Sequence, residues 1–82
     1  MSIDEAIKEL IGNETNTRFS RLLTICKQFF GEPRVKGSHY IFKTPWQGDP
    51  RINLQEADSG KAKPYQVSQV VEALQKLKGM GK

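Results

Sequence analysis

Apolar side chains recur at helical spacing at the start of the chain. They are Ile3, Ile7, Leu10 and Ile11. Ser2 and Glu5 have the spacing of a capping box, in which each side chain satisfies a backbone N–H at the start of a helix. The pattern stops at Gly12-Asn13, so we predict a short amphipathic helix over residues 2–11.

Two further stretches carry one apolar stripe at three- and four-residue steps, which predicts two longer helices. Between residues 18 and 30 the stripe consists of Phe19, Leu22, Leu23, Cys26, Phe29 and Phe30. We expect Asn16 or Thr17 to cap this helix and Gly31 to end it. In the last helix, for which Pro64 suits the first turn, the stripe consists of Val67, Val70, Val71, Leu74 and Leu77.

Between these helices the apolar residues alternate with polar ones, as is typical of strands. We predict strands at about residues 34–36, 39–44 and 51–55, the first two joined by a Gly37-Ser38 turn in which Gly37 takes the positive φ. Alternation places Val35, Tyr40, Phe42, Ile52 and Leu54 toward the helices. The opposite face receives Arg34, Lys36, His39, Ile41, Lys43, Arg51, Asn53 and Gln55.

The order of these elements predicts an α+β fold, with helices on one face of a three-stranded antiparallel sheet. We divide the chain into an N-terminal helical extension with its loop, residues 1–16, and a main domain, residues 17–82. For the first helix the sequence leaves three roles open: packing on the main domain, self-association, or covering the basic face of the sheet.

Composition narrows the function classes. The 82 residues are 37% hydrophobic with no long apolar run, which indicates one small domain without a membrane span. The first residues lack the features of a signal peptide and there is a single cysteine, so we expect a cytoplasmic protein. One Cys and one His are too few for a zinc site, and no cofactor is expected. Cys26 lies on an apolar stripe with nothing nearby to generate a thiolate, so we interpret it as a core residue.

Charge is divided unevenly along the chain. Residues 1–16 carry a net charge of −3, whereas residues 17–82 carry +7. A basic main domain makes a polyanion such as nucleic acid the first partner to consider. Lys61 and Lys63 stand at the start of the last helix, where the helix dipole repels cations unless an anion binds there. A solvated sheet face and two exposed loop lysines would explain the same charges without a ligand.

The α-β-β-β-α order with a Lys-rich start to the last helix resembles double-stranded-RNA-binding domains. The stretch from Val35 to Phe42, with Gly37-Ser38-His39, a third strand and Gly60-Lys61 leading into Tyr65-Gln66-Val67, resembles the HicA toxin family over roughly residues 18–77. The resemblance implies an mRNA interferase of a type II toxin–antitoxin system on a dsRBD-like fold. It also implies a HicB-like antitoxin as partner and a histidine that is essential for cleavage, a role that only His39 can fill.

RNA cleavage through the 2′-hydroxyl needs a base, an acid and cations that stabilise the charge on phosphorus. Histidine changes charge near neutral pH, so His39 suits one of the two proton transfers, and the scheme needs no metal. Lys36 or Lys43 can stabilise charge, whereas Ser38 is expected to shape the turn. The candidate RNA-binding residues are Arg34, Lys36, Lys43, Arg51, Lys61 and Lys63.

Two other functions remain open at this point. In the first, the domain binds double-stranded RNA through Lys61, Lys63 and the basic sheet face and does not cleave it. Alternatively it is a protein-interaction domain whose basic face is masked by an acidic partner. A lone histidine on a strand is also commonly structural or merely exposed. The RNA sequence preference, the second acid–base group, the oligomeric state and the identity of an antitoxin are not predicted by the sequence.

Overall fold

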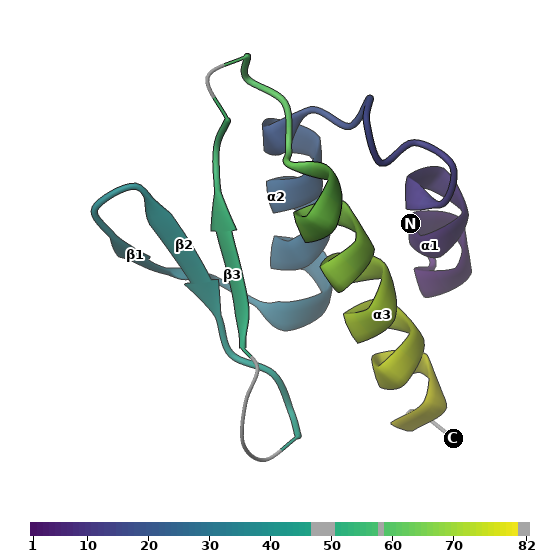
Figure 1. The fold of residues 1–82 in the computed structure, drawn as a ribbon. Helices are drawn as coiled ribbons and strands as arrows, with labels where there is room; N and C mark the ends of the chain where they lie inside the picture. Colours follow the sequence, from purple (N-terminus) through teal and green to yellow (C-terminus); the bar gives the residue numbers. More distant parts are fainter. Residues whose placement is uncertain (47–50, 58, 81–82) are drawn as a thin grey trace.

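The chain folds into a three-stranded antiparallel sheet with two helices on one face and a third helix behind them (Figure 1). This computed structural model describes residues 1–46, 51–57 and 59–80, so residues 47–50 of the connection between the second and third strands lie outside the description. The elements are α1 (Ile3–Leu10), α2 (Phe19–Phe30), β1 (Arg34–Lys36), β2 (His39–Phe42), β3 (Ile52–Gln55) and α3 (Pro64–Met80). The predicted α+β class is confirmed, with the α-β-β-β-α order preceded by an extra helix.

Local signals in the sequence account for the helix ends. At the start of α1 the capping box is present, because Glu5 N donates to Ser2 Oγ at 3.1 Å and Ser2 N donates to Glu5 Oε1 at 2.8 Å. The predicted cap of α2 was wrong. Arg18 occupies the N-cap position, and its side chain makes no capping hydrogen bond. The hydroxyl of Thr17, which is buried, donates to the Asn13 carbonyl at 2.8 Å.

The sheet has the order β1-β2-β3, with Lys36 opposite His39 and His39 opposite Gln55. Gly37 has a φ of 61°. The φ of Ser38 is not positive, as is the case for every non-glycine residue that the structure describes. A positive φ at the first turn position only is the pattern of a type II′ hairpin turn, which matches the twist of the two strands. His39 therefore follows directly after a tight corner.

The core lies between the sheet and the helices α2 and α3, and α1 contributes to it from behind α3. Its fully buried members include Leu10, Leu22, Ile25, Cys26, Phe42, Ile52, Leu54, Val67, Val70 and Leu74. Burial differs from the predicted pattern at several positions, including Leu77, which is only partly buried. Ile25 is buried whereas Leu23, Phe29 and Phe30 are only partly buried, and Val35 is 58% exposed. Val35 belongs to β1, the outer strand, whereas the buried sheet residues belong to β2 and β3.

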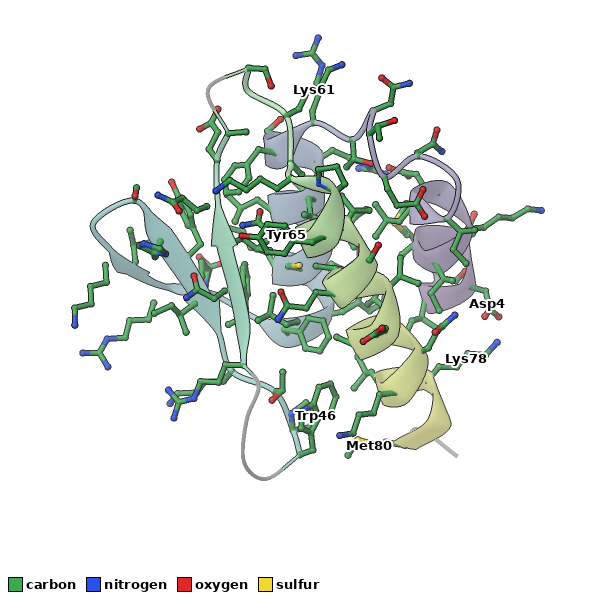
Figure 2. All side chains as sticks on the ribbon, in the orientation of Figure 1. Asp4, Trp46, Lys61, Tyr65, Lys78 and Met80 are labelled. Atoms are coloured by element: carbon green, nitrogen blue, oxygen red, sulfur yellow. The ribbon has the colours of Figure 1, made fainter. Side chains whose placement is uncertain are left out.

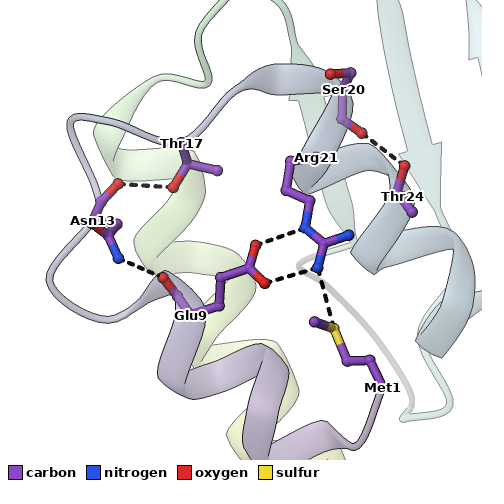
Figure 3. Close-up of polar contacts among 7 residues, drawn as sticks. All are labelled: Met1, Glu9, Asn13, Thr17, Ser20, Arg21 and Thr24. Atoms are coloured by element: carbon purple, nitrogen blue, oxygen red, sulfur yellow. Dashed lines mark hydrogen bonds and ion pairs between the residues drawn. The ribbon is translucent and has the colours of Figure 1, made fainter.

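Helix α1 is packed on the main domain, which is one of the three roles left open by the sequence. Ala6 and Leu10 are completely buried, and Asp4 forms an ion pair with Lys78 of α3 (Figure 2). At the other end of α1, Glu9 accepts two hydrogen bonds from Arg21 of α2, at 2.7 and 2.8 Å (Figure 3). The acidic helix therefore lies on the far side of α3 from the sheet (Figure 1).

Trp46 closes the lower end of the core next to α3 (Figure 2). Its ring meets Phe30 edge to face, with centroids 6.3 Å apart, and Lys76 Nζ lies 4.5 Å from its centroid. Among the described helices, none is long and apolar enough to cross a membrane.

Candidate functional site

His39 is the first residue of β2 and its side chain is exposed. Its Nδ1 lies 3.1 Å from Oδ1 of Asn53, which stands diagonally across on β3 and on the same face of the sheet. An amide oxygen only accepts hydrogen bonds, so Nδ1 carries the hydrogen in both the neutral and the charged ring. Nε2 is consequently the ring nitrogen that this contact leaves unengaged.

A groove of about 250 Å³ lies beside His39, between β3 and the start of α3. It is lined by His39, Asn53, Gln55, Tyr65, Gln66 and Gln69. Tyr65 is 64% exposed and extends from the first turn of α3 toward β3 (Figure 2). The groove thus combines an imidazole, a phenol and four amides, and none of its lining side chains is a Lys, Arg, Asp or Glu.

Two glutamines of α3 hold this helix against the outer edge of β3. The Gln66 side chain is buried, and the Gln55 N–H and carbonyl each lie 3.1 Å from its terminal amide. When the amide is oriented with its nitrogen toward the carbonyl and its oxygen toward the N–H, it donates to the first and accepts from the second. Gln69 Nε2 donates to the Arg51 carbonyl at 3.4 Å. These bonds satisfy backbone groups that an edge strand otherwise leaves unpaired, and they fix the distance between the two walls of the groove.

The turn is tied to the same strand. Gln55 Nε2 donates to Ser38 Oγ at 3.1 Å, which links the corner before His39 to β3. Gly37 supplies the backbone conformation and Ser38 supplies the hydrogen-bond acceptor. His39 is therefore held through Asn53 on one side and through its own turn on the other.

Four of the six predicted RNA-binding residues lie in the strands of the sheet or directly next to them, and all four are exposed. They are Arg34 and Lys36 on β1, Lys43 after β2 and Arg51 before β3. Lys36 is directly opposite His39 in the β1–β2 pair. Lys43 and Arg51 line a second hollow of about 180 Å³ together with Thr44 and Trp46.

Lys61 and Lys63 form a separate group at the start of α3. The backbones of Lys61 and Arg18 form an isolated antiparallel β-bridge. The Nζ atom of Lys61 lies 3.4 Å from Asn16 Oδ1. Lys63 is half-buried, and its carbonyl accepts the first helical hydrogen bonds of α3. Figure 2 shows Lys61 at the opposite end of the molecule from Trp46, next to which Lys43 and Arg51 lie. The six predicted RNA-binding residues therefore lie in two regions and not in one.

Sequence reasoning did not identify Tyr65, Gln66 or Gln69 as site residues. A signal was present at Gln66, which stands four positions before Val70 on the buried stripe of α3, where an apolar residue is expected. A polar residue at such a position needs a buried hydrogen-bond partner, and here the partner is the edge of β3.

Among the described residues, neither Cys26 nor a cluster of metal-ligating side chains contributes to the candidate site. Burial raises the pKa of the Cys26 thiol to about 12, which keeps it protonated at neutral pH and unsuited to act as a nucleophile. Among the residues that the structure describes, no group of three or more His, Cys, Asp or Glu side chains is arranged to hold a metal ion. Comparison of the chain with known protein families, with curated proteins and with solved structures finds no match.

Proposed function

We propose that this chain is an endoribonuclease that cleaves mRNA without a metal, as the toxin of a type II toxin–antitoxin pair. The supporting observation is the position of His39, which is exposed directly after the Gly37-Ser38 turn and whose Nδ1 lies 3.1 Å from Asn53 Oδ1. Its Nε2 is left for proton transfer. The resemblance of the sequence around Gly37-Ser38-His39 to HicA toxins supports the same activity.

In the proposed reaction, His39 Nε2 removes the proton from a ribose 2′-hydroxyl and the 2′-oxygen attacks the adjacent phosphorus. The bond from phosphorus to the 5′-oxygen breaks, and that oxygen takes a proton from an acid or from water. The products are a 2′,3′-cyclic phosphate and a 5′-hydroxyl end. In this proposal Lys36 stabilises the negative charge that develops on the phosphoryl oxygens, which is supported by its position directly opposite His39 in the β1–β2 pair.

A HicB-like antitoxin would inhibit this activity most simply by covering His39 and the basic sheet residues. Arg34 and Lys36 on the exposed β1 favour an acidic partner surface. An antitoxin that blocks cleavage while leaving His39 accessible would contradict this arrangement.

RNA cleavage by purified wild type and His39→Ala, with a chelator present, tests the proposal. Val35→Ala is the matched control, because Val35 is exposed on the same hairpin but on the other face of the sheet. We expect cleavage by the wild type and by Val35→Ala, and none by His39→Ala. Full cleavage by His39→Ala would refute the proposal.

A second candidate function is a double-stranded-RNA-binding module without catalysis. It is favoured by Lys61 and Lys63, which place two ammonium groups at the start of α3, where phosphate binding is expected in such domains. In that case wild type and His39→Ala would both bind RNA with a steep salt dependence, and neither would cut it.

A further inference from the structure

Three adjoining hollows lead from His39 to the connection between β2 and β3. The first is the groove beside His39, which Gln69 also lines. Gln69 lines a second hollow of about 180 Å³ as well, together with Trp46 and Lys76. Trp46 in turn lines the third hollow, which contains Lys43. Each hollow shares a lining residue with the next, so the three lie side by side, and we call them together the surface path.

An aromatic side chain stands in each part of the surface path. Tyr65, which is 64% exposed, lines the groove, and Trp46, which is partly buried, lines the other two hollows. Figure 2 shows Tyr65 near the start of α3 and Trp46 near its end. Lys76, whose Nζ lies 4.5 Å from the centroid of the Trp46 ring, comes eleven positions after Tyr65 on α3, a rise of about 16 Å. The distance along α3 from one aromatic side chain to the other is therefore that of a few nucleotides.

Positive charge lies on both sides of the groove and not in it. No Lys, Arg, Asp or Glu is among the described residues that line the groove. Two lysines stand just before α3, next to Tyr65 in the chain, and three cations line the hollows around Trp46 together with one carboxylate, Glu72. The first pair is Lys61 and Lys63, and the second group is Lys43, Arg51 and Lys76.

We propose that the surface path binds a single strand of RNA, with Tyr65 and Trp46 as two stacking platforms. Proteins that bind single strands combine cations for the phosphates with aromatic side chains on which the bases stack. The bases of a duplex are already stacked on one another and paired, so they are not free to stack on Tyr65. Stacking of this kind tolerates every base. That the base on Tyr65 adjoins the cleaved bond rests on the proposed function of His39, whereas binding of the strand does not.

Fluorescence anisotropy with a labelled RNA of about 16 nucleotides, the length that a double-stranded-RNA-binding domain covers, tests this proposal. The RNA is used as a single strand and as a duplex, and every protein carries His39→Ala so that no strand is cut. We expect the single strand to bind about tenfold more tightly than the duplex. A duplex that binds as tightly as the single strand, or no binding of either form, would overturn the proposal.

Tyr65 is tested by two substitutions that separate its ring from its hydroxyl. Tyr65→Ala should weaken binding of the single strand by about tenfold, because the stacking surface is lost. Tyr65→Phe keeps the ring and should bind within about twofold of the parent protein. Equal affinities of the two variants would contradict a stacking role for Tyr65.

Trp46 can be tested without a substitution, since it is the one tryptophan in the chain. A base that stacks on the indole ring quenches its fluorescence, so the single strand should lower the Trp46 signal as it saturates the protein. An unchanged signal at saturation would exclude Trp46 as a platform.

The cations near Trp46 are tested by the salt dependence of binding. Lys43→Ala/Lys76→Ala should reduce the salt slope for the single strand by about 1.4, which corresponds to two phosphate contacts. Lys8→Ala is the control, because Lys8 is exposed on α1, on the far side of α3 from the sheet. A slope that the double substitution leaves unchanged, or that Lys8→Ala reduces as much per lysine, would contradict the path.

The outcomes for the surface path and for the proposed nuclease are separable. Preferential binding of the single strand that depends on Tyr65, by a protein whose wild type does not cut RNA, would support the path and refute the nuclease. Cleavage of RNA by the wild type, combined with equal affinity for the single strand and the duplex, would support the nuclease and refute the path.

Discussion

Replacing the buried Gln66 by methionine tests how α3 is attached to β3. Methionine has a similar length but cannot form the two 3.1 Å bonds to the backbone of Gln55. The Gln55 N–H and carbonyl would both lose their side-chain partner, and the methionine would keep water out of most of the space that the amide occupies. An unsatisfied backbone group costs about 1–3 kcal/mol. Two such groups at the half-buried Gln55, partly relieved by solvent, reduce the free energy of unfolding by about 2–4 kcal/mol.

Urea denaturation followed by circular dichroism measures this loss. Gln75→Met on the exposed side of the same helix is the matched control and should change stability by less than about 0.5 kcal/mol. The midpoint should fall for Gln66→Met with an unchanged slope, which indicates lower stability and not a different denatured state. If Gln66→Met is as stable as the control, the two bonds do not hold α3 on β3, and the walls of the groove are fixed in another way.

Three other predictions concern α1 and the basic residues. Leu10→Ala should lower the free energy of unfolding by about 2–5 kcal/mol in urea, while Ile11→Ala, at a position 51% exposed, should cost far less; equal losses would mean that α1 is not part of the core. Glu9→Gln should destabilise at neutral pH, because Arg21 holds the pKa of Glu9 below its usual 4.5. That contribution to stability is present above about pH 4.5 and is lost as the pH falls through the lowered folded-state pKa of Glu9. The urea curves of wild type and Glu9→Gln should therefore converge in acid. A difference in stability that does not change with pH would exclude the charge of Glu9 as its source. The double substitution Lys61→Ala/Lys63→Ala should reduce the salt slope of RNA binding by about 2, and an unchanged slope would exclude these lysines as phosphate contacts.

The elements themselves follow from local patterns, and so they are predictable from the sequence. The capping box of Ser2 and Glu5, the stop at Gly31 and the turn at Gly37 each depend on residues within a few positions of one another. Alternation also assigns Phe42 and Ile52 correctly to the core. It fails for Val35, because alternation gives the face of a residue but not whether a helix covers its strand.

The groove depends on contacts that no local pattern contains. Asn53 stands on the same face as His39 by alternation, but their hydrogen bond requires the β2–β3 register, which the sequence leaves unfixed. Tyr65 and Gln69 join the site because Gln66 docks α3 on the edge of β3. Similarly, the packing of α1 on α3 depends on the burial of Leu10 in the core, which is a contact between distant parts of the chain. The sequence alone was equally compatible with self-association of this helix or with its covering the basic face of the sheet.

The central claim is that His39 carries a proton during RNA cleavage, and the pH dependence of the cleavage rate tests it most directly. The rate is measured for wild type and His39→Ala with enzyme in excess over a labelled RNA, in chelator, over about pH 5–9, the interval in which histidines titrate. The account predicts that the wild-type rate changes about tenfold per pH unit on one side of a bend within this interval, and that His39→Ala does not cleave. A wild-type rate that does not vary with pH, or cleavage by His39→Ala at the wild-type rate, would contradict it.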